Sequence, residues 1–173
     1  ETYLYIREYH KKLMIGIFEP NAKNAFSKTG KVPNNFSFGE FKVDKNYVNM
    51  LHKLASKRIP EINKLNIEKY FSGPESFTPD TNYLLGETSE IKNFYVCCGF
   101  NSIGIGSAGG AGKATAEWMM RGHTKEDLLS LDVKRFEKFN SSLKFIKERV
   151  TESLGNLFKM HWPFKQLTTS RNI

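Results

Sequence analysis

The residues with the clearest chemical potential are the glycines of 104–112, which follow a short apolar run and open an amphipathic one. Glycines let a ligand approach the backbone closely, and the first turn of a helix offers unpaired N–H donors at a positive end. Such a turn suits a group that becomes electron-rich during a reaction, such as the pyrimidine ring of a flavin. The residues support a structural alternative equally well, in which Gly109, Gly110 and Gly112 only let the helix pack tightly on a sheet.

Two nucleotide-binding motifs share part of this pattern but fail at defined positions. Gly104-Ile-Gly-Ser-Ala-Gly109 fits G-x-G-x-x-G, but a dinucleotide fingerprint also needs a second strand that ends in an acidic residue about 20 positions later. Residues 123–127 lie there instead and are typical of a polar helix start. A phosphate loop ending at Gly112-Lys113 would need Gly at Ser107 and Ser or Thr at Ala114. Neither a dinucleotide fingerprint nor an NTPase is indicated.

Cysteine and histidine usage indicates no metal site. The only cysteines are Cys97 and Cys98, and neighbours in a strand point to opposite faces, so they cannot easily pair. No CxxC or Cys/His ligand spacing can be assembled, and the four histidines are scattered. We therefore expect no bound metal, and a structural role for both thiols in a reducing compartment.

Length and composition favour a folded, soluble protein. The 173 residues are 39% apolar and 13% aromatic, which excludes a disordered tail and allows one domain or parts of two. No apolar run approaches the roughly 20 residues that span a bilayer. The net charge of +8 raises the question of nucleic acid, but basic and acidic residues are interspersed, as in 144–152. We expect neither nucleic acid nor a membrane among the partners.

Hydrophobic periodicity predicts the elements that precede the glycine-rich turn. Alternation over 3–18 predicts a β-hairpin, and the spacing after the candidate N-cap Asp44 predicts a helix that ends at Pro60. Short apolar runs at 83–86 and 94–98 predict two strands. The second run is apolar throughout, as in a strand covered on both faces.

The sequence after the turn predicts three helices, over about 108–121, 128–139 and 142–158, and Gly122 suits a left-handed cap for the first. The expected buried face of that first helix consists of Ala111, Ala114, Thr115, Trp118 and Met119.

Three segments in this order and spacing, 73–80, 83–87 and 94–119, together resemble one family. They are similar to the C-terminal half of the flavin domain in sarcosine and dimethylglycine dehydrogenases, which belong to the D-amino-acid oxidase-like flavoproteins. Residues 3–19 resemble the substrate-domain strands of that family, and Asp132-Val-Lys-Arg-Phe136 resembles its Asp-x-x-Arg-Phe segment. The resemblance covers nearly the whole chain.

The resemblance implies an α+β fold: a fragment of an FAD-binding domain, with its last strands and helix, joined to part of an antiparallel substrate-binding sheet. Residues 1–60 would form part of the substrate-binding domain, and 61–122 the C-terminal part of the FAD-binding domain. Residues 123–158 would form a helical extension, and 159–173 a linker towards an absent folate-binding domain. Because the chain opens inside a strand-like run, we expect its N-terminus to be a cut, and the resemblance implies that the N-terminal half of the flavin domain lies upstream.

The chemistry implied by the resemblance is oxidative demethylation of an N-methylated glycine by hydride transfer to FAD, with the one-carbon unit leaving as formaldehyde or on tetrahydrofolate. The partners would be a small methylated amine, an electron acceptor (a flavoprotein or oxygen) and the missing half of the flavin domain. The expected compartment is the bacterial cytoplasm or the mitochondrial matrix. No catalytic residue is identified, and we expect the fragment alone to be inactive and to bind FAD poorly.

In this family the backbone between the last strand and the helix lies against the flavin ring. The positions that correspond to it here are Ser102, Ile103, Gly104, Ile105 and Gly106. Gly73 occupies the place of a flavin-linked cysteine in the monomeric sarcosine oxidases, so a covalent link from this chain is not expected.

A non-catalytic alternative stays open. The regulatory subunit of pyruvate dehydrogenase phosphatase resembles the same family, including the segments Gly-Gly-Ala-Gly-Lys (109–113) and Ala-Glu-Trp-Met (116–119). The residues that would distinguish an enzyme from such a subunit are expected upstream of Glu1.

Overall fold

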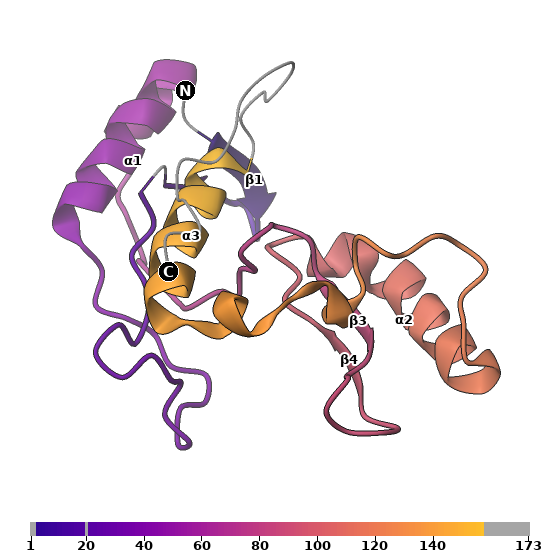
Figure 1. Ribbon diagram of the computed structural model, residues 1–173. Helices are drawn as coiled ribbons and strands as arrows, with labels where there is room; N and C mark the ends of the chain where they lie inside the picture. The colour runs from indigo at the N-terminus through magenta and orange to yellow at the C-terminus, as the bar shows by residue number, and fades with distance from the viewer. Residues whose placement is uncertain (1–2, 20, 158–173) are drawn as a thin grey trace, which may run out of the picture. The chain divides into compact units, whose positions relative to one another are not determined.

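The computed structural model describes residues 3–19 and 21–157, so the predicted linker 159–173 lies outside the described residues. The chain divides into two compact units, Glu1–Pro74 and Glu75–Ile173, which are taken separately below. The described residues form two small antiparallel sheets and three α-helices (Figure 1). The expected α+β class is confirmed.

The first unit begins with the predicted hairpin, formed by β1 (Tyr3–Tyr9) and β2 (Lys12–Phe18). The register pairs Tyr3 with Phe18 and Tyr9 with Lys12. His10 and Lys11 make the turn with positive φ values of 51° and 62°, a geometry that suits the twist of a two-residue hairpin.

Helix α1 (Lys45–Arg58) packs beside this hairpin (Figure 1). As predicted, Asp44 caps it, because its carboxylate accepts a 3.0 Å hydrogen bond from the Asn46 N–H. A second hydrogen bond, from Lys23, holds the pKa of the Asp44 carboxyl below its usual range. The helix ends before Pro60, which opens the 3₁₀ turn η1 (Pro60–Lys64).

The second unit is built on β3 (Leu84–Glu87) and β4 (Tyr95–Cys98), which are antiparallel and match the two predicted strands. Helix α2 (Gly104–Arg121) packs on this pair (Figure 1), and Gly122 caps it with a left-handed φ of 76°. Leu85 lies at the centre of the unit, only 1% exposed. Its N–H donates to the Leu131 carbonyl at 2.8 Å, so the segment after α2 extends the sheet.

Gly86 in β3 fixes the distance between the sheet and α2. Its φ is +100°, and a Cβ there would lie 2.7 Å from the ring of Trp118. We predict that Gly86→Ala destabilises the unit by about 2 kcal/mol or more, because it adds both backbone strain and overlap. Urea unfolding measures the change. Gly112→Ala, where a Cβ meets nothing within 4 Å, is the control and should be neutral or stabilising.

The segment 128–139 is not the α-helix that the periodicity predicts. Two short 3₁₀ turns form instead: η2 (Val133–Arg135) lies within the segment, and η3 (Lys138–Ser141) begins near its end. The reason is that side-chain hydrogen bonds compete with those of an α-helix. The carboxylates of Asp127 and Asp132 accept hydrogen bonds from the backbone N–H groups two residues ahead, at 3.1 and 2.8 Å. The last predicted helix is confirmed as α3 (Leu143–Asn156).

Three further details differ from the sequence-based expectation. Helix α2 begins at Gly104, four residues before the predicted start. Met119, expected in its buried face, is 59% exposed. Cys97 and Cys98 are exposed, so the described residues do not cover β4 on both faces. Partial desolvation nevertheless raises the pKa of the Cys98 thiol, and the neighbouring Cys97 adds to this, which makes it a poor nucleophile at neutral pH.

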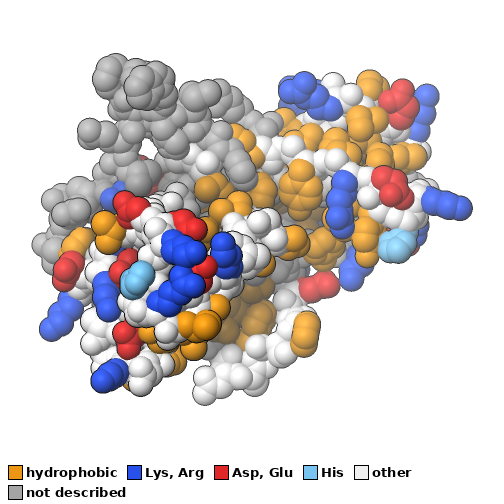
Figure 2. Space-filling view, turned by 90° about the vertical axis from the view of Figure 1, so that its right-hand side faces the viewer, with side chains coloured by type: hydrophobic (Ala, Val, Ile, Leu, Met, Phe, Trp, Pro, Cys, Tyr) orange, Lys and Arg blue, Asp and Glu red, His pale blue; other side chains and the backbone are white. Residues whose placement is uncertain are grey.

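The surface shows the mixture of charges expected from the sequence. Figure 2 shows Lys and Arg side chains lying among Asp and Glu on the face turned to the viewer, rather than in one continuous basic patch. Within the described part of the chain, no helix combines the length and apolar character needed to cross a membrane.

Candidate functional site

The chain passes from β4 into α2 through a turn with an unusual backbone. Asn101 and Ser102 both have positive φ values, 49° and 69°. Residues other than glycine rarely adopt this left-handed backbone conformation, although asparagine does so more readily than most. The Ser102 hydroxyl donates to the carboxylate of Glu75, which ties the exposed half of the turn to an earlier segment. The turn is therefore held in its shape by side-chain contacts.

Asn101 makes several of these contacts and is 1% exposed. Its Oδ1 accepts the Thr78 N–H at 2.8 Å, and its Nδ2 donates to the Gly99 carbonyl at 2.7 Å. Its own N–H donates to the Ser76 carbonyl at 3.2 Å. Because both ends of the buried amide are paired, this side chain fixes the left-handed backbone with little desolvation cost.

The first turn of α2 is open to a ligand. The N-cap residue Ile103 provides no side-chain hydrogen bond, and no acidic residue lies in the first turn. The N–H groups of Gly104, Ile105 and Gly106 have no acceptor within the helix. At Gly106 a Cβ would meet nothing within 4 Å, and the Ile105 side chain is fully exposed. The positive end of an 18-residue helix is thus accessible to an electron-rich group.

The structure therefore brings all five predicted residues, Ser102 to Gly106, into one continuous element: the end of a left-handed turn and the first turn of a helix. Their backbone suits the pyrimidine side of a flavin, which accepts hydrogen bonds and gains negative charge on reduction. The donor set thus fits the cofactor suggested by the resemblance.

The structural alternative, in which the remaining glycines allow tight packing, receives no support from contacts among residues 3–19 and 21–157. A Cβ at Gly109, Gly110 or Gly112 would meet nothing within 4 Å. Tight packing of α2 depends instead on Ala111, which is 2% exposed, and on Gly86 opposite Trp118.

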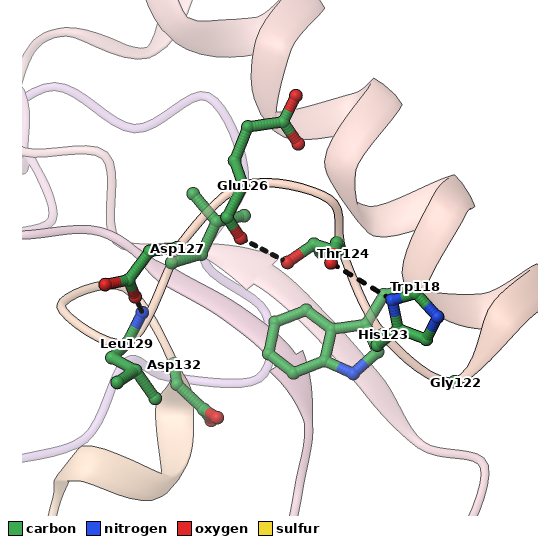
Figure 3. Close-up of a pocket in the computed structure, with 9 residues that line it drawn as sticks. Trp118, Gly122, His123, Thr124, Glu126, Asp127, Leu129 and Asp132 are labelled. Carbon is green, nitrogen blue, oxygen red and sulfur yellow. Dashed lines mark hydrogen bonds between the residues drawn. The ribbon is translucent and has the colours of Figure 1, made fainter.

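A separate surface pocket of about 210 Å³ lies at the other end of α2, around Trp118 and His123 (Figure 3). Its polar groups are engaged in local turns: His123 contacts the Thr124 carbonyl at 3.1 Å, and the Thr124 hydroxyl donates to the Glu126 carbonyl at 2.8 Å. An 18-residue helix is about 27 Å long, so this pocket is remote from the turn before α2. We assign it no catalytic role. Among the described residues, no three His, Cys, Asp or Glu side chains are grouped to hold a metal ion.

Sequence reasoning missed the residues that shape the turn. Asn101 could have been predicted from the sequence, because asparagine in a short strand-to-helix connection indicates a residue with left-handed backbone conformation. The contact of Asp80 with Arg135 had no such signal, since the two are separated by 55 positions and meet only in the folded chain.

Comparison with known families identifies the family to which the chain belongs. Residues 1–118 match the sequence model of the FAD dependent oxidoreductase family, and residues 121–173 match that of the FAD dependent oxidoreductase central domain. The chain belongs to the FAD-dependent oxidoreductases. The boundary between the two matches lies near the end of α2. The division into the four parts 1–60, 61–122, 123–158 and 159–173 stays a prediction.

Three curated relatives are similar over nearly the whole chain. The 4-methylaminobutanoate oxidase (formaldehyde-forming) of Paenarthrobacter nicotinovorans is 37% identical over 98% of this chain and 20% of its own length. The mitochondrial pyruvate dehydrogenase phosphatase regulatory subunit of Mus musculus is 33% identical, over 98% and 19%. The mitochondrial sarcosine dehydrogenase of Homo sapiens is 32% identical, over 98% and 18%. The chain thus spans about a fifth of the length of these relatives.

Proposed function

We propose that this chain is part of an enzyme that oxidatively demethylates sarcosine or dimethylglycine with FAD as the cofactor. The observation that carries the proposal is the uncapped first turn of α2, held by the left-handed Asn101–Ser102 pair, in a chain of the FAD-dependent oxidoreductase family. The names of two relatives support the substrate class, because sarcosine and 4-methylaminobutanoate both join an N-methyl amine to a carboxylate.

In this proposal FAD, when bound, would supply the electron sink by accepting a hydride equivalent from the N-methyl carbon, and hydrolysis of the oxidised amine would give formaldehyde and the demethylated amine. The residues of this chain provide position and electrostatics. The backbone of Ser102–Gly106 would hold the pyrimidine side of the ring, and the N–H groups at the helix start would stabilise the charge that reduction adds. No residue of the chain is assigned to proton transfer.

Several features of the whole protein belong to the same proposal. Tetrahydrofolate would accept the one-carbon unit where a folate-binding domain is present, and a flavoprotein or oxygen would reoxidise the flavin. The bacterial cytoplasm or the mitochondrial matrix is the proposed compartment, since the relatives include a bacterial oxidase and mitochondrial proteins.

A regulatory function is the second candidate. It is favoured by one observation, the 33% identity to the phosphatase regulatory subunit over 98% of this chain. That identity is close to the value for the dehydrogenase, so similarity alone does not separate the two functions.

The deciding experiment is the visible absorption spectrum of the full-length protein without oxygen, before and after addition of sarcosine, dimethylglycine or 4-methylaminobutanoate. Bleaching of the flavin band by either glycine derivative supports the proposed enzyme. Bleaching only by 4-methylaminobutanoate would support the same type of reaction but change the assigned substrate. Purified protein without any flavin band would contradict the enzyme and favour the regulatory function.

A further inference from the structure

The loop of residues 78–82 is held by three separate parts of the second unit. Ser153 of α3 donates to a loop carbonyl at 2.9 Å. Arg135 of η2 donates to another loop carbonyl at 2.7 Å. On the other side, Asn101 accepts a loop N–H at 2.8 Å. The loop therefore connects the segment that follows α2 with the turn that precedes it.

The central contact is a two-point ion pair between Arg135 and Asp80. Nε of the guanidinium lies 2.7 Å from Oδ2 of the carboxylate, and Nη2 lies 3.1 Å from Oδ1. The guanidinium also donates to the carbonyls of Asp132 and Asn82 and lies 4.4 Å from the centre of the Phe136 ring. The Arg135 side chain is only 14% exposed. Such a paired, stacked guanidinium has one geometry, unlike a solvated surface charge.

Hydrogen bonds continue from this ion pair to the turn. The Thr78 hydroxyl lies 3.2 Å from the Asp80 carboxylate and 2.8 Å from the Asn82 carbonyl, and its single proton satisfies one of these acceptors. The same hydroxyl accepts the Asn101 amide N–H at 3.2 Å. Both Thr78 and Asn101 are buried, at 5% and 1% exposure, so water does not compete for these contacts.

We propose that Arg135 and Asp80 are positioning residues for flavin binding, acting through Thr78 and Asn101 on the first turn of α2; this rests on the proposed function. The dihedral angles of Asn101 and Ser102 set the direction in which the N–H groups of the first turn point. Left-handed residues keep that conformation only while surrounding contacts enforce it. Glu75 and Ser76 contact the turn directly, and the ion pair adds a further contact from outside the strand-turn-helix segment by holding the loop that contains Thr78.

The ion pair also joins two parts of the chain that match different family models. Asp80 and Asn101 lie within 1–118, the match to the FAD dependent oxidoreductase model, while Arg135 lies within 121–173, the match to the central-domain model. In this proposal the central-domain segment adds to the contacts that keep the turn in its binding geometry.

The test compares Arg135→Met with Lys134→Met in the full-length protein. Lys134 is the exposed neighbour in the same 3₁₀ turn, so both variants remove one positive charge at nearly the same place. We expect Arg135→Met to raise the dissociation constant for FAD by about tenfold and to alter the flavin absorption band. Amide hydrogen exchange of residues 103–107 should become faster. Lys134→Met should leave all three unchanged.

A double variant tests whether the effect passes through Asn101. Asn101→Gly keeps the left-handed backbone accessible and removes only the side-chain bonds. If Arg135 acts through Asn101, the double variant binds FAD about as weakly as the weaker single variant. If the two act independently, their fold-changes multiply, which contradicts the proposed route.

The remaining outcomes also decide the matter. If Arg135→Met lowers the thermal midpoint but leaves FAD affinity, spectrum and exchange equal to those of Lys134→Met, the residue is structural only and the proposal is wrong. Should Arg135→Met not fold, Arg135→Lys replaces it, with a smaller loss expected because an ammonium cannot pair with both carboxylate oxygens at once. If the wild-type protein does not bind FAD, the proposed function itself is wrong. If the wild-type protein binds FAD and Arg135→Met binds it equally well, only the positioning role is wrong.

Discussion

Replacement of Gly106 by valine is expected to weaken FAD binding by the full-length protein by about a hundredfold. The new side chain would stand on the first turn of α2, at the surface proposed to face the flavin ring. Folding should be unaffected, because a Cβ at this position meets nothing within 4 Å and valine costs a helix less than glycine does. The substitution therefore separates ligand access from stability.

Fluorescence titration of the apoprotein with FAD measures the effect, and the circular dichroism spectrum checks the fold. The matched control is Ala116→Val, which adds two methyl groups to an exposed position three turns further along the same helix and should leave the dissociation constant unchanged. Equal FAD affinity for Gly106→Val and the wild-type protein would show that this turn does not face the flavin, and the assignment of Ser102–Gly106 would have to be withdrawn.

Leu85→Ala is expected to destabilise the second unit by about 3 kcal/mol, the usual cost of emptying a buried leucine site. Leu85 is 1% exposed, and its strand pairs with β4 on one side and with the segment at Leu131 on the other. A cavity there loosens the sheet that carries the turn into α2. Hydrogen exchange of the β3 and β4 amides in urea reports the local loss directly.

Leu129→Ala is the corresponding control, because this leucine is 75% exposed and its truncation should change the free energy of unfolding by less than about 0.5 kcal/mol. A small effect of Leu85→Ala, similar to that of Leu129→Ala, would mean that the sheet has no fixed core at this position. That result would also weaken the view that β3 and β4 hold in place the turn proposed to face the flavin.

Local patterns in the sequence were enough to predict most elements. The hairpin, the Asp44 cap, the two short strands and the Gly122 cap depend on side-chain alternation or on the chemistry of single residues. Such signals depend on only a few neighbouring residues, so they can be interpreted without knowledge of the rest of the fold. The combination of segments also led to the correct family, which the matches over 1–118 and 121–173 confirm.

The tertiary structure decided what the local signals left open. Residues 128–139 have helical spacing, but two Asx contacts and the bond from Leu85 to Leu131 hold them in another conformation. Helix α2 begins at Gly104 despite its glycines, because the fixed turn before it and the burial of Ala111 outweigh a propensity cost of about 1 kcal/mol per glycine.

Only the tertiary structure brought together the contacts that hold the turn before α2 and the ion pair proposed to act on it. The sequence by itself determined the family, through short segments in a fixed order and spacing, and the position of the glycine-rich turn, which lies in contiguous residues. The Arg135–Asp80 pair and the link from Thr78 to Asn101 join positions 55 and 23 residues apart, respectively. No periodicity or propensity encodes such a distance, so only the folded chain brings these groups together.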